Sequence, residues 1–292
     1  MKEFRDKTAV VTGAASGIGQ ALAERFAKEG MNVVLADIEE EALARTAGEM
    51  KANGATVLAV QTDVAKGADV EDLAEKTVQA FGGVHVVCNN AGVAPVAGAT
   101  WELAEADWQW VLGVNLWGVI HGIRAFVPRM LEQDAEGHIV NTASVAGLLS
   151  APWMATYDVS KHGVVTLSES LHQELAQAGS KLKVSVLCPA WVQTQLMDAD
   201  RNRPAELRDA AGTGTTRPEA AVFNEAVRAL VAGGSAASRV ADRVCEAIRE
   251  ERFYVLPHPE WKDRVRERME DILNERNPST EPATETIQET AR

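Results

Sequence analysis

The chain has 292 residues, of which 46% are hydrophobic and 24% charged, a composition that suits a globular protein with a sizeable core. Its formal net charge of -13 argues against a nucleic-acid partner, because phosphate backbones are bound by basic faces. No run of about 18 apolar residues occurs, and the N-terminal MKEFRDKTAVVTG lacks the apolar core of a signal peptide. We therefore expect a cytoplasmic protein with neither a nucleic-acid nor a membrane partner.

Short apolar runs alternate with helical periodicity along the first two thirds of the chain. The runs predict strands at 8–13, 31–37, 56–64, 84–92, 137–144 and 183–190, and the periodic segments predict helices at 18–30, 39–54, 68–82, within 101–133 (two patterns) and at 157–178. The strands are almost continuously apolar, as in sheets covered on both faces. This predicts a single α/β domain over residues 1–276, a Rossmann-like doubly wound parallel sheet with helices on both faces.

The last third of the chain is less regular. Residues 195–237 are rich in Arg, Ala, Gly, Thr and Pro without a strong period, which favours a mobile substrate flap over a plain surface insertion. RFYVLPHPE (252–260) is typical of a last strand, and 258–276 predicts a C-terminal helix with one apolar face. The polar tail, 277–292, is expected to be disordered.

A glycine-rich turn, TGAASGIG from Thr12 to Gly19, joins the first predicted strand to the first helix. Glycines in this context let a ligand's phosphates approach the backbone and the helix N-terminus. Asp37 ends the second predicted strand, where a carboxylate can bind the ribose hydroxyls of adenosine and repel a 2′-phosphate. No Arg or Lys lies in the turn or just after Asp37, so NAD is favoured over NADP. A helix N-cap is the alternative role for Asp37.

Tyr157 is one of only two tyrosines and stands four residues before Lys161 in YDVSK. On a helix both side chains share one face. A free tyrosine has a pKa of about 10, and a nearby lysine cation favours the phenolate. Such a pair alone is more often a surface feature. With Ser144 and Asn115 upstream and the glycine turn in the same chain, the Tyr157–Lys161 pair becomes a candidate acid–base group.

These motifs together resemble the short-chain dehydrogenases/reductases. The matching residues are Thr12-Gly-x-x-x-Gly17-x-Gly19, Asp63-Val64, Asn89-Asn90-Ala91-Gly92, Asn115, Ser144 and Tyr157-x-x-x-Lys161. The resemblance implies an NAD(H)-dependent oxidoreductase that interconverts a secondary alcohol and its ketone by hydride transfer. The C-terminal half is also similar to the lignin Cα-dehydrogenase branch, whose members oxidise benzylic secondary alcohols.

The resemblance also implies a role for each matching residue. Tyr157 would exchange a proton with the substrate, and Ser144 would hydrogen-bond the substrate oxygen. Lys161 would favour the phenolate and bind the nicotinamide ribose, while Asn115 would hold a water on a proton path. Cofactor contacts would come from Gly13, Ser16, Gly17, Ile18, Gly19, Asp37, Ile38, Asp63, Val64, Asn89, Asn90, Ala91, Gly92, Tyr157, Lys161, Pro189, Val192 and Thr194.

The sequence departs from the family pattern at one place near the nicotinamide. Ala190 stands where the family has Gly after Pro189, and Ala restricts the path of that loop. The helices within 101–133 and at 157–178 would form the interface of a homodimer or homotetramer, as the resemblance implies.

The substrate pocket is expected from the loops around these residues. Its candidate lining is Val93, Leu148, Leu149, Trp153, Met154, Trp191, Leu196 and Met197. None of these is basic, which favours a bulky, apolar or aromatic secondary alcohol or ketone over a phosphate or coenzyme A substrate. Plain core or subunit contacts are the alternative for the Trp and Met residues. The six histidines lack metal-ligand spacing, so no metal is expected.

Three other functions remain open from the sequence. One is a catalytically silent nucleotide-sensing or structural homologue, and another is an NADP(H)-dependent ketoreductase. A dehalogenase-type variant of the fold is the third. The complete set of Ser144, Tyr157, Lys161 and Asn115 weighs against the first, and the glycine turn with Asp37 weighs against the third.

Overall fold

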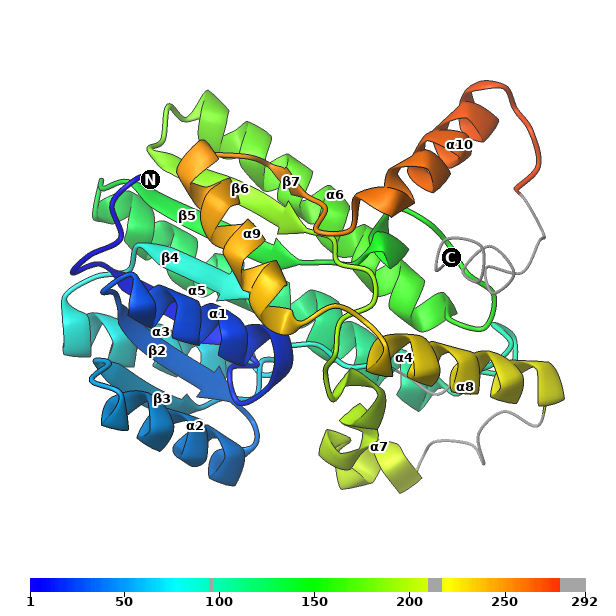
Figure 1. Cartoon of the computed structure of the whole chain (residues 1–292), viewed down its shortest axis with the longest axis horizontal. Coiled ribbons are helices and arrows are strands. Elements are labelled where there is room, and N and C mark those ends of the chain that lie inside the picture. Colours follow the sequence, from blue (N-terminus) through cyan, green and yellow to red (C-terminus); the bar gives the residue numbers. More distant parts are fainter. Residues whose placement is uncertain (95–96, 210–216, 279–292) are drawn as a thin grey trace.

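In the computed structural model of the chain, which describes residues 1–94, 97–209 and 217–278, a seven-stranded sheet forms the centre (Figure 1). The strands lie in the order β3-β2-β1-β4-β5-β6-β7, and all neighbours pair in parallel. They are β1 (Thr8–Thr12), β2 (Asn32–Asp37), β3 (Val57–Gln61), β4 (Val86–Asn89), β5 (Gly137–Thr142), β6 (Leu182–Leu187) and β7 (Tyr254–Val255). The predicted doubly wound parallel sheet is confirmed.

Helices cover both faces of this sheet. They are α1 (Gly17–Lys28), α2 (Glu40–Ala52), α3 (Gly67–Phe81), α4 (Glu105–Leu112), α5 (Gly118–Glu132), α6 (Ala155–Gln177), α7 (Ala205–Asp209), α8 (Pro218–Ala232), α9 (Ala237–Glu250) and α10 (Lys262–Leu273). One core lies between the sheet and α1, α2 and α9, and the other lies between the sheet and α3, α5 and α6. Successive side chains of β1 point to opposite faces of the sheet. Ala9 and Val11 therefore pack in the first core and Val10 packs in the second.

The two helical patterns expected within 101–133 form one continuous stretch, Glu105–Glu132. A π-helical turn at Gly113–Trp117 joins α4 to α5, and such turns often occur at functional sites. By length and composition this stretch could cross a membrane, but half of its most apolar window is buried inside the protein. Core helices of globular proteins meet the same test.

The C-terminal third contains more helix than the sequence analysis anticipates. Helix α9 was not predicted, although Val240, Val244 and Ile248 stand at four-residue intervals and are fully buried. The strand expected at 252–260 pairs only at Tyr254–Val255, and Pro257 follows within two residues without an N–H to donate. Of the tail expected at 277–292, residues 279–292 lie outside the described part of the chain.

The flap segment (residues 195–237) forms a 3₁₀ stretch, Leu196–Asn202, and then α7 and α8. Three of its arginines pair with acids of the main body. Arg201 lies 2.5 Å from Glu39, Arg203 lies 2.7 Å from Asp107, and Arg217 lies 2.7 Å from Glu102. These pairs attach the flap segment to the β2–α2 connection and to the region of α4.

Close packing of α5 on β4 gives a stability prediction. A Cβ added at Gly122 would lie 1.9 Å from Oδ1 of Asn89, whose amide nitrogen donates to Asn141 Oδ1 at 2.9 Å. We expect Gly122→Ala to lower the free energy of unfolding by about 1–3 kcal/mol through overpacking. Gly48→Ala is the control, because a Cβ on that helical residue meets nothing within 4 Å. It should raise the same quantity by about 0.5–1 kcal/mol. Urea unfolding followed by circular dichroism measures both, and equal values for the two variants would contradict the packing argument.

Candidate active site

The site lies at the carboxyl ends of the strands, where the strand order reverses between β1 and β4. Ligands bind at such switch points because the connections on either side diverge. A cavity of about 380 Å³ opens here, lined by the glycine turn, the ends of β2 to β6, the flap segment and α10. Thr12 Oγ1 accepts hydrogen bonds from the backbone nitrogens of Asn90 and Ala91 at 2.9 and 3.0 Å. Asn90 Nδ2 donates back to Thr12 O at 2.9 Å, so the two strand ends are joined directly.

The glycine turn leads straight from β1 into α1. A Cβ at Gly19 would lie 2.0 Å from Gly13 O, so glycine is required at that position. Ser16 is the N-cap residue, yet its side chain makes no capping hydrogen bond, and the first turn of α1 holds no acidic residue. The first N–H groups of the helix and its positive dipole end are therefore available to an anionic group in the cavity.

Asp37 lines the cavity at the end of β2. Its carboxylate accepts hydrogen bonds from Ala15 N at 2.9 Å and from Glu39 N at 3.0 Å. Burial raises the pKa of Asp37, although the backbone hydrogen bonds oppose this shift. The N-cap residue of α2 is Glu39, not Asp37. Each Asp37 oxygen retains a further acceptor site, so the carboxylate can receive ribose hydroxyls as well.

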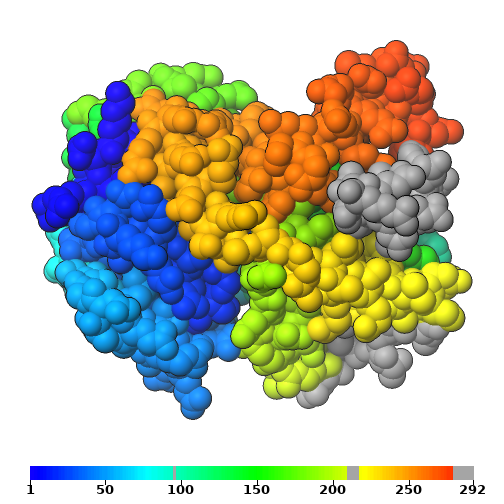
Figure 2. All heavy atoms as spheres, viewed as in Figure 1, coloured from blue at the N-terminus to red at the C-terminus, as the bar shows by residue number. Residues whose placement is uncertain are grey.

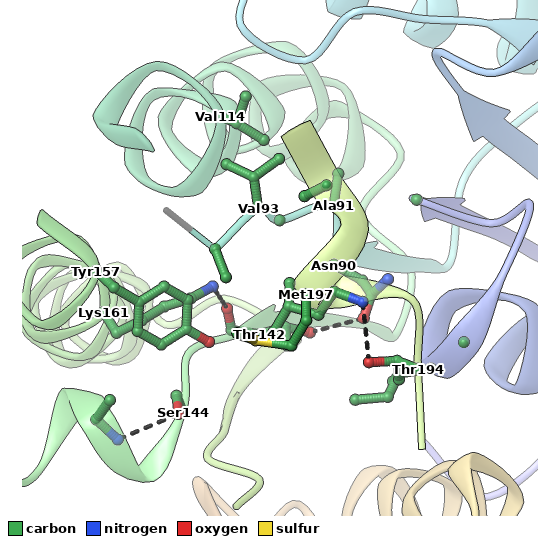
Figure 3. A pocket seen from close by; sticks show the side chains of 18 of the residues that line it. Asn90, Ala91, Val93, Val114, Thr142, Ser144, Tyr157, Lys161, Thr194 and Met197 are labelled. Carbon is green, nitrogen blue, oxygen red and sulfur yellow. Dashed lines mark hydrogen bonds between the residues drawn. The ribbon is translucent and has the colours of Figure 1, made fainter. Parts of the chain in front are cut away.

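Tyr157, Ser144 and Lys161 come together on one side of the cavity (Figure 3). Tyr157 and Lys161 lie on α6, where the lysine Nζ is 5.5 Å from the centroid of the phenol ring. Lys161 Nζ donates to Thr142 O at 3.0 Å, which fixes the ammonium beside the end of β5. Ser144 hydrogen-bonds Tyr157, and its Oγ also lies 3.3 Å from Pro189 O. The predicted trio therefore forms one cluster.

Asn115 is fully buried at the π turn and does not line the cavity. Its side chain accepts from Val93 N at 2.8 Å and donates to Val93 O at 2.9 Å. It also donates to Ser160 Oγ at 3.2 Å. In this structure Asn115 thus positions the loop after β4 against α6.

Comparison with known proteins decides the family. The profile described as short chain dehydrogenase matches residues 7–205. The chain belongs to the short-chain dehydrogenases. A solved short-chain dehydrogenase from Burkholderia phymatum in complex with NAD is 48% identical, with a TM-score of 0.92 and coverage of 96% of this chain and 98% of that one.

Two curated relatives extend over nearly the whole length. The 1-deoxy-11-beta-hydroxypentalenate dehydrogenase of Streptomyces exfoliatus is 38% identical over 270 residues, or 92% of this chain and 89% of the relative. A C alpha-dehydrogenase of Sphingobium sp. is 28% identical over 278 residues, or 94% and 88%. The expected similarity to the lignin Cα-dehydrogenase branch is thereby confirmed.

Burial dominates the electrostatics of this dehydrogenase site. It raises the pKa of Tyr157 to about 12, and the hydrogen bond with Ser144 opposes the shift. Burial also lowers the pKa of Lys161 to about 8. That Lys161 and an oxidised nicotinamide ring together favour the phenolate stays a prediction. In the chain without cofactor, burial of the phenol is the largest influence on its pKa and favours the protonated form.

The cavity gathers most of the residues expected from the sequence. Gly13, Ser16, Gly17, Ile18, Gly19, Asp37, Ile38, Asp63, Val64, Asn90, Ala91, Gly92, Pro189, Val192 and Thr194 line it at the expected cofactor positions. Val93, Leu149, Met154, Trp191, Leu196 and Met197 line it as expected for a substrate wall. Asn89, Leu148 and Trp153 are not among the lining residues. Asn89 instead bonds Asn141 in the core, and Trp153 takes a left-handed turn conformation with φ of 70°.

Two basic residues in the cavity were missed by the sequence analysis. Arg201 and Arg264 both line it, whereas the predicted substrate wall lists no basic residue. They come from the flap segment and from α10, far along the chain from the motifs. The Ala190 departure from the family pattern is harmless, because Ala190 is not among the residues with positive φ.

Asp158, next to Tyr157, is an unusual buried acid. It is 6% exposed and lines the cavity. Its Oδ2 accepts from Ala151 N at 2.9 Å, whereas Oδ1 is buried without a partner among the described residues. Burial raises the pKa of Asp158 to about 7. The carboxyl thus joins α6 to the loop that carries Leu149 and Met154.

This raised pKa predicts a pH-dependent stability. A folded-state pKa of about 7 against about 3.9 in the unfolded chain means that the folded state holds the extra proton between these values. Its stabilising effect is complete below the unfolded pKa and is lost as the pH rises through 7. We expect Asp158→Asn to remove about 2 kcal/mol of the stability lost between pH 5 and pH 8. Urea unfolding at the two pH values measures this. Asp72→Asn, at an exposed position of α3, is the control. An identical pH dependence in wild type and Asp158→Asn would contradict the assignment.

Proposed function

We propose that the protein is an NAD(H)-dependent oxidoreductase that interconverts a bulky, largely apolar secondary alcohol and its ketone. One observation carries this proposal. A single cavity holds Tyr157, Ser144 and Lys161 together with the glycine turn and Asp37. A cofactor bound across this cavity would lie with its phosphates at α1 and its reactive ring beside the tyrosine.

The residues present fit a dinucleotide with a free adenosine 2′-hydroxyl. The uncapped N-terminus of α1 suits the pyrophosphate, and Asp37 suits the ribose hydroxyls. Arg201 lines the same cavity, and an arginine can bind the 2′-phosphate of NADP. Its guanidinium, however, pairs with Glu39 at 2.5 Å. The NAD in the Burkholderia phymatum relative also supports this choice.

The residues of the chain then move the proton. When bound, the oxidised cofactor would supply the hydride acceptor, and its positive ring would offset the burial that keeps Tyr157 protonated. During oxidation the Tyr157 oxygen takes the hydroxyl proton as the carbon–hydrogen bond breaks, and during reduction it returns that proton. Ser144 hydrogen-bonds the substrate oxygen, where charge develops. Lys161, held by Thr142 O, keeps positive charge beside the phenol.

The cavity wall supports a bulky apolar substrate. Trp110, Met197 and Phe223 line it together with the expected Val93 and Met154. The Streptomyces exfoliatus and Sphingobium relatives are named for a hydroxypentalenate and for a Cα position. Both names are compatible with a ring-bearing secondary alcohol.

We further propose a cytoplasmic homo-oligomer. Trp117 and Val159, on the helices expected at the interface, are 49% exposed each, and apolar residues so placed suit a subunit contact. All three cysteines are free and buried, which suits a reducing compartment.

Replacement of the two tyrosines tests the mechanism. We expect Tyr157→Phe to lower kcat by about 10²–10⁴-fold, because the proton-transfer group is lost, with NADH binding nearly unchanged. Tyr254→Phe is a matched control, since that hydroxyl bonds Glu169 on the outside of the protein. Absorbance of reduced nicotinamide, with secondary alcohols from small aliphatic to bulky benzylic, measures turnover. Normal turnover by Tyr157→Phe would overturn the mechanism, and silence across the panel with NADH still bound would favour a sensing role.

Replacement of Asp37 tests the cofactor preference. We expect Asp37→Ala to reduce the preference for NADH over NADPH by about tenfold or more, since hydrogen bonds to a charged group are lost. Asp37 also holds Ala15 N, so both cofactors lose affinity from a looser turn. The ratio of the two dissociation constants cancels that shared loss. A ratio equal to that of the wild type would rule out the ribose role.

A further inference from the structure

His258 connects three segments that come from different parts of the chain. It follows β7, and its Nδ1 accepts a hydrogen bond from Ala190 N, in the loop after β6, at 3.1 Å. Its Nε2 lies 2.9 Å from Ser235 Oγ, near the end of the flap segment. On the face that Figure 2 shows, the yellow flap segment and the orange chain toward β7 lie side by side. His258 does not line the cavity, so it can act on the reaction only through the residues that it holds.

The two hydrogen bonds of His258 fix which ring nitrogen carries the proton. A backbone N–H can only donate, so Nδ1 must be unprotonated to accept from Ala190. The proton of the neutral ring is then on Nε2, which donates to Ser235 Oγ. Burial lowers the pKa of His258, and Glu260 opposes this shift. The ring is therefore held as an acceptor toward Ala190.

The peptide group between Pro189 and Ala190 joins His258 to the reacting cluster. Its N–H donates to His258, while its carbonyl oxygen accepts from Val145 N at 2.9 Å and from Ser144 Oγ at 3.3 Å. A peptide group is planar, so its N–H and its carbonyl turn together. The imidazole therefore fixes the direction in which the Pro189 carbonyl points at Ser144.

The Ser144 hydroxyl is the group on which this orientation acts. Its Oγ hydrogen-bonds Tyr157 and accepts from Ala146 N at 3.1 Å. Its own donation to Pro189 O, at 3.3 Å, is a long contact that a substrate oxygen can replace. A carbonyl turned closer would retain the hydroxyl proton, and one turned away would leave the side chain free to rotate.

We propose that His258 is a positioning residue for the reaction: as a neutral hydrogen-bond acceptor, it holds the Pro189–Ala190 peptide so that Ser144 presents its hydroxyl to Tyr157 and to the substrate oxygen. The inference rests on the proposed function, and it gives the YVLPHPE stretch (254–260) a part in the site. The role requires an acceptor at the position of Nδ1 rather than an imidazole ring as such.

Two uncharged amides at position 258 separate the roles of the two ring nitrogens. Oδ1 of His258→Asn can take the place of Nδ1, whereas the amide of His258→Gln reaches the place of Nε2 and leaves Ala190 N without this acceptor. We expect His258→Gln to lower kcat by about tenfold to hundredfold, because small displacements of reacting groups are costly, and His258→Asn to stay within about threefold of wild type. Turnover of the secondary-alcohol panel with NAD measures both. Equal kcat values for the two variants would overturn the proposal.

His85→Gln is the matched control. Nδ1 of His85 also accepts from a backbone nitrogen, Thr8 N, at 3.1 Å, but it does so at the start of β1, and His85 does not line the cavity. Loss of this acceptor should lower the free energy of unfolding and leave kcat unchanged. A fall of kcat as large as that in His258→Gln would show that lost stability suffices, and the positioning role would be wrong.

A double-mutant cycle tests the path through Ser144. In a Ser144→Ala background, His258→Gln should lower kcat by less than about twofold, because residues that act through one another are not additive. The same fold loss with and without the Ser144 hydroxyl would mean that His258 acts elsewhere, against the proposal.

A second readout needs no turnover and therefore separates this proposal from the proposed function. Tyr254→Phe leaves Tyr157 as the single tyrosine, and the Cζ resonance of carbon-13-labelled tyrosine reports the hydrogen bonding of its phenol. Ser144→Ala gives the resonance without the serine hydroxyl. His258→Gln should shift the resonance toward that position, and His258→Asn should not. This pattern without oxidation of any alcohol would support the positioning of Ser144 and count against the reaction. An unchanged resonance in His258→Gln would overturn the positioning.

Discussion

The hydrogen bonds that join Thr12 to the Asn90 and Ala91 backbone and to the Asn90 side chain are the constraint on which the rest of the site depends. They join the carboxyl ends of β1 and β4 at the place where the strand order reverses. The glycine turn begins immediately after Thr12, and the loop to Val93 begins immediately after Asn90. The start of α1 is therefore held against the loop after β4 through the Thr12 hydroxyl and carbonyl.

Burial gives the cluster of Tyr157, Asp158 and Lys161 its electrostatic character. It raises the pKa of Tyr157 to about 12 and of Asp158 to about 7, and it lowers that of Lys161 to about 8. In all three cases the pKa moves in the direction that favours the uncharged form, as expected in a medium of low dielectric constant. A charge that enters this cavity, whether on a cofactor ring or a substrate, is weakly screened and acts strongly on its neighbours.

The sequence predicts those parts of the protein that depend on local spacing. The pair of Tyr157 and Lys161 could be predicted because both residues lie on one helix at i,i+4 spacing. The turn up to Gly19 could be predicted because strand, turn and helix there are contiguous in the sequence. Arg264 could not be assigned to the cavity, because α10 reaches it from another part of the chain. The pKa of Tyr157 was also out of reach, since it depends on how deeply the finished fold buries the phenol. Helix α9 did carry a readable signal in the spacing of its valines.

The ion pairs of the flap segment differ in how they respond to dissolved salt. Arg201 and Glu39 are 35% and 28% exposed in their side chains, whereas Arg203 is 6% exposed where it meets Asp107. Counter-ions screen exposed pairs far more than buried ones. Rising ionic strength should thus weaken the Arg201–Glu39 pair more than the Arg203–Asp107 pair. The two ion pairs thus tie the flap segment to the body of the protein with unequal sensitivity to salt.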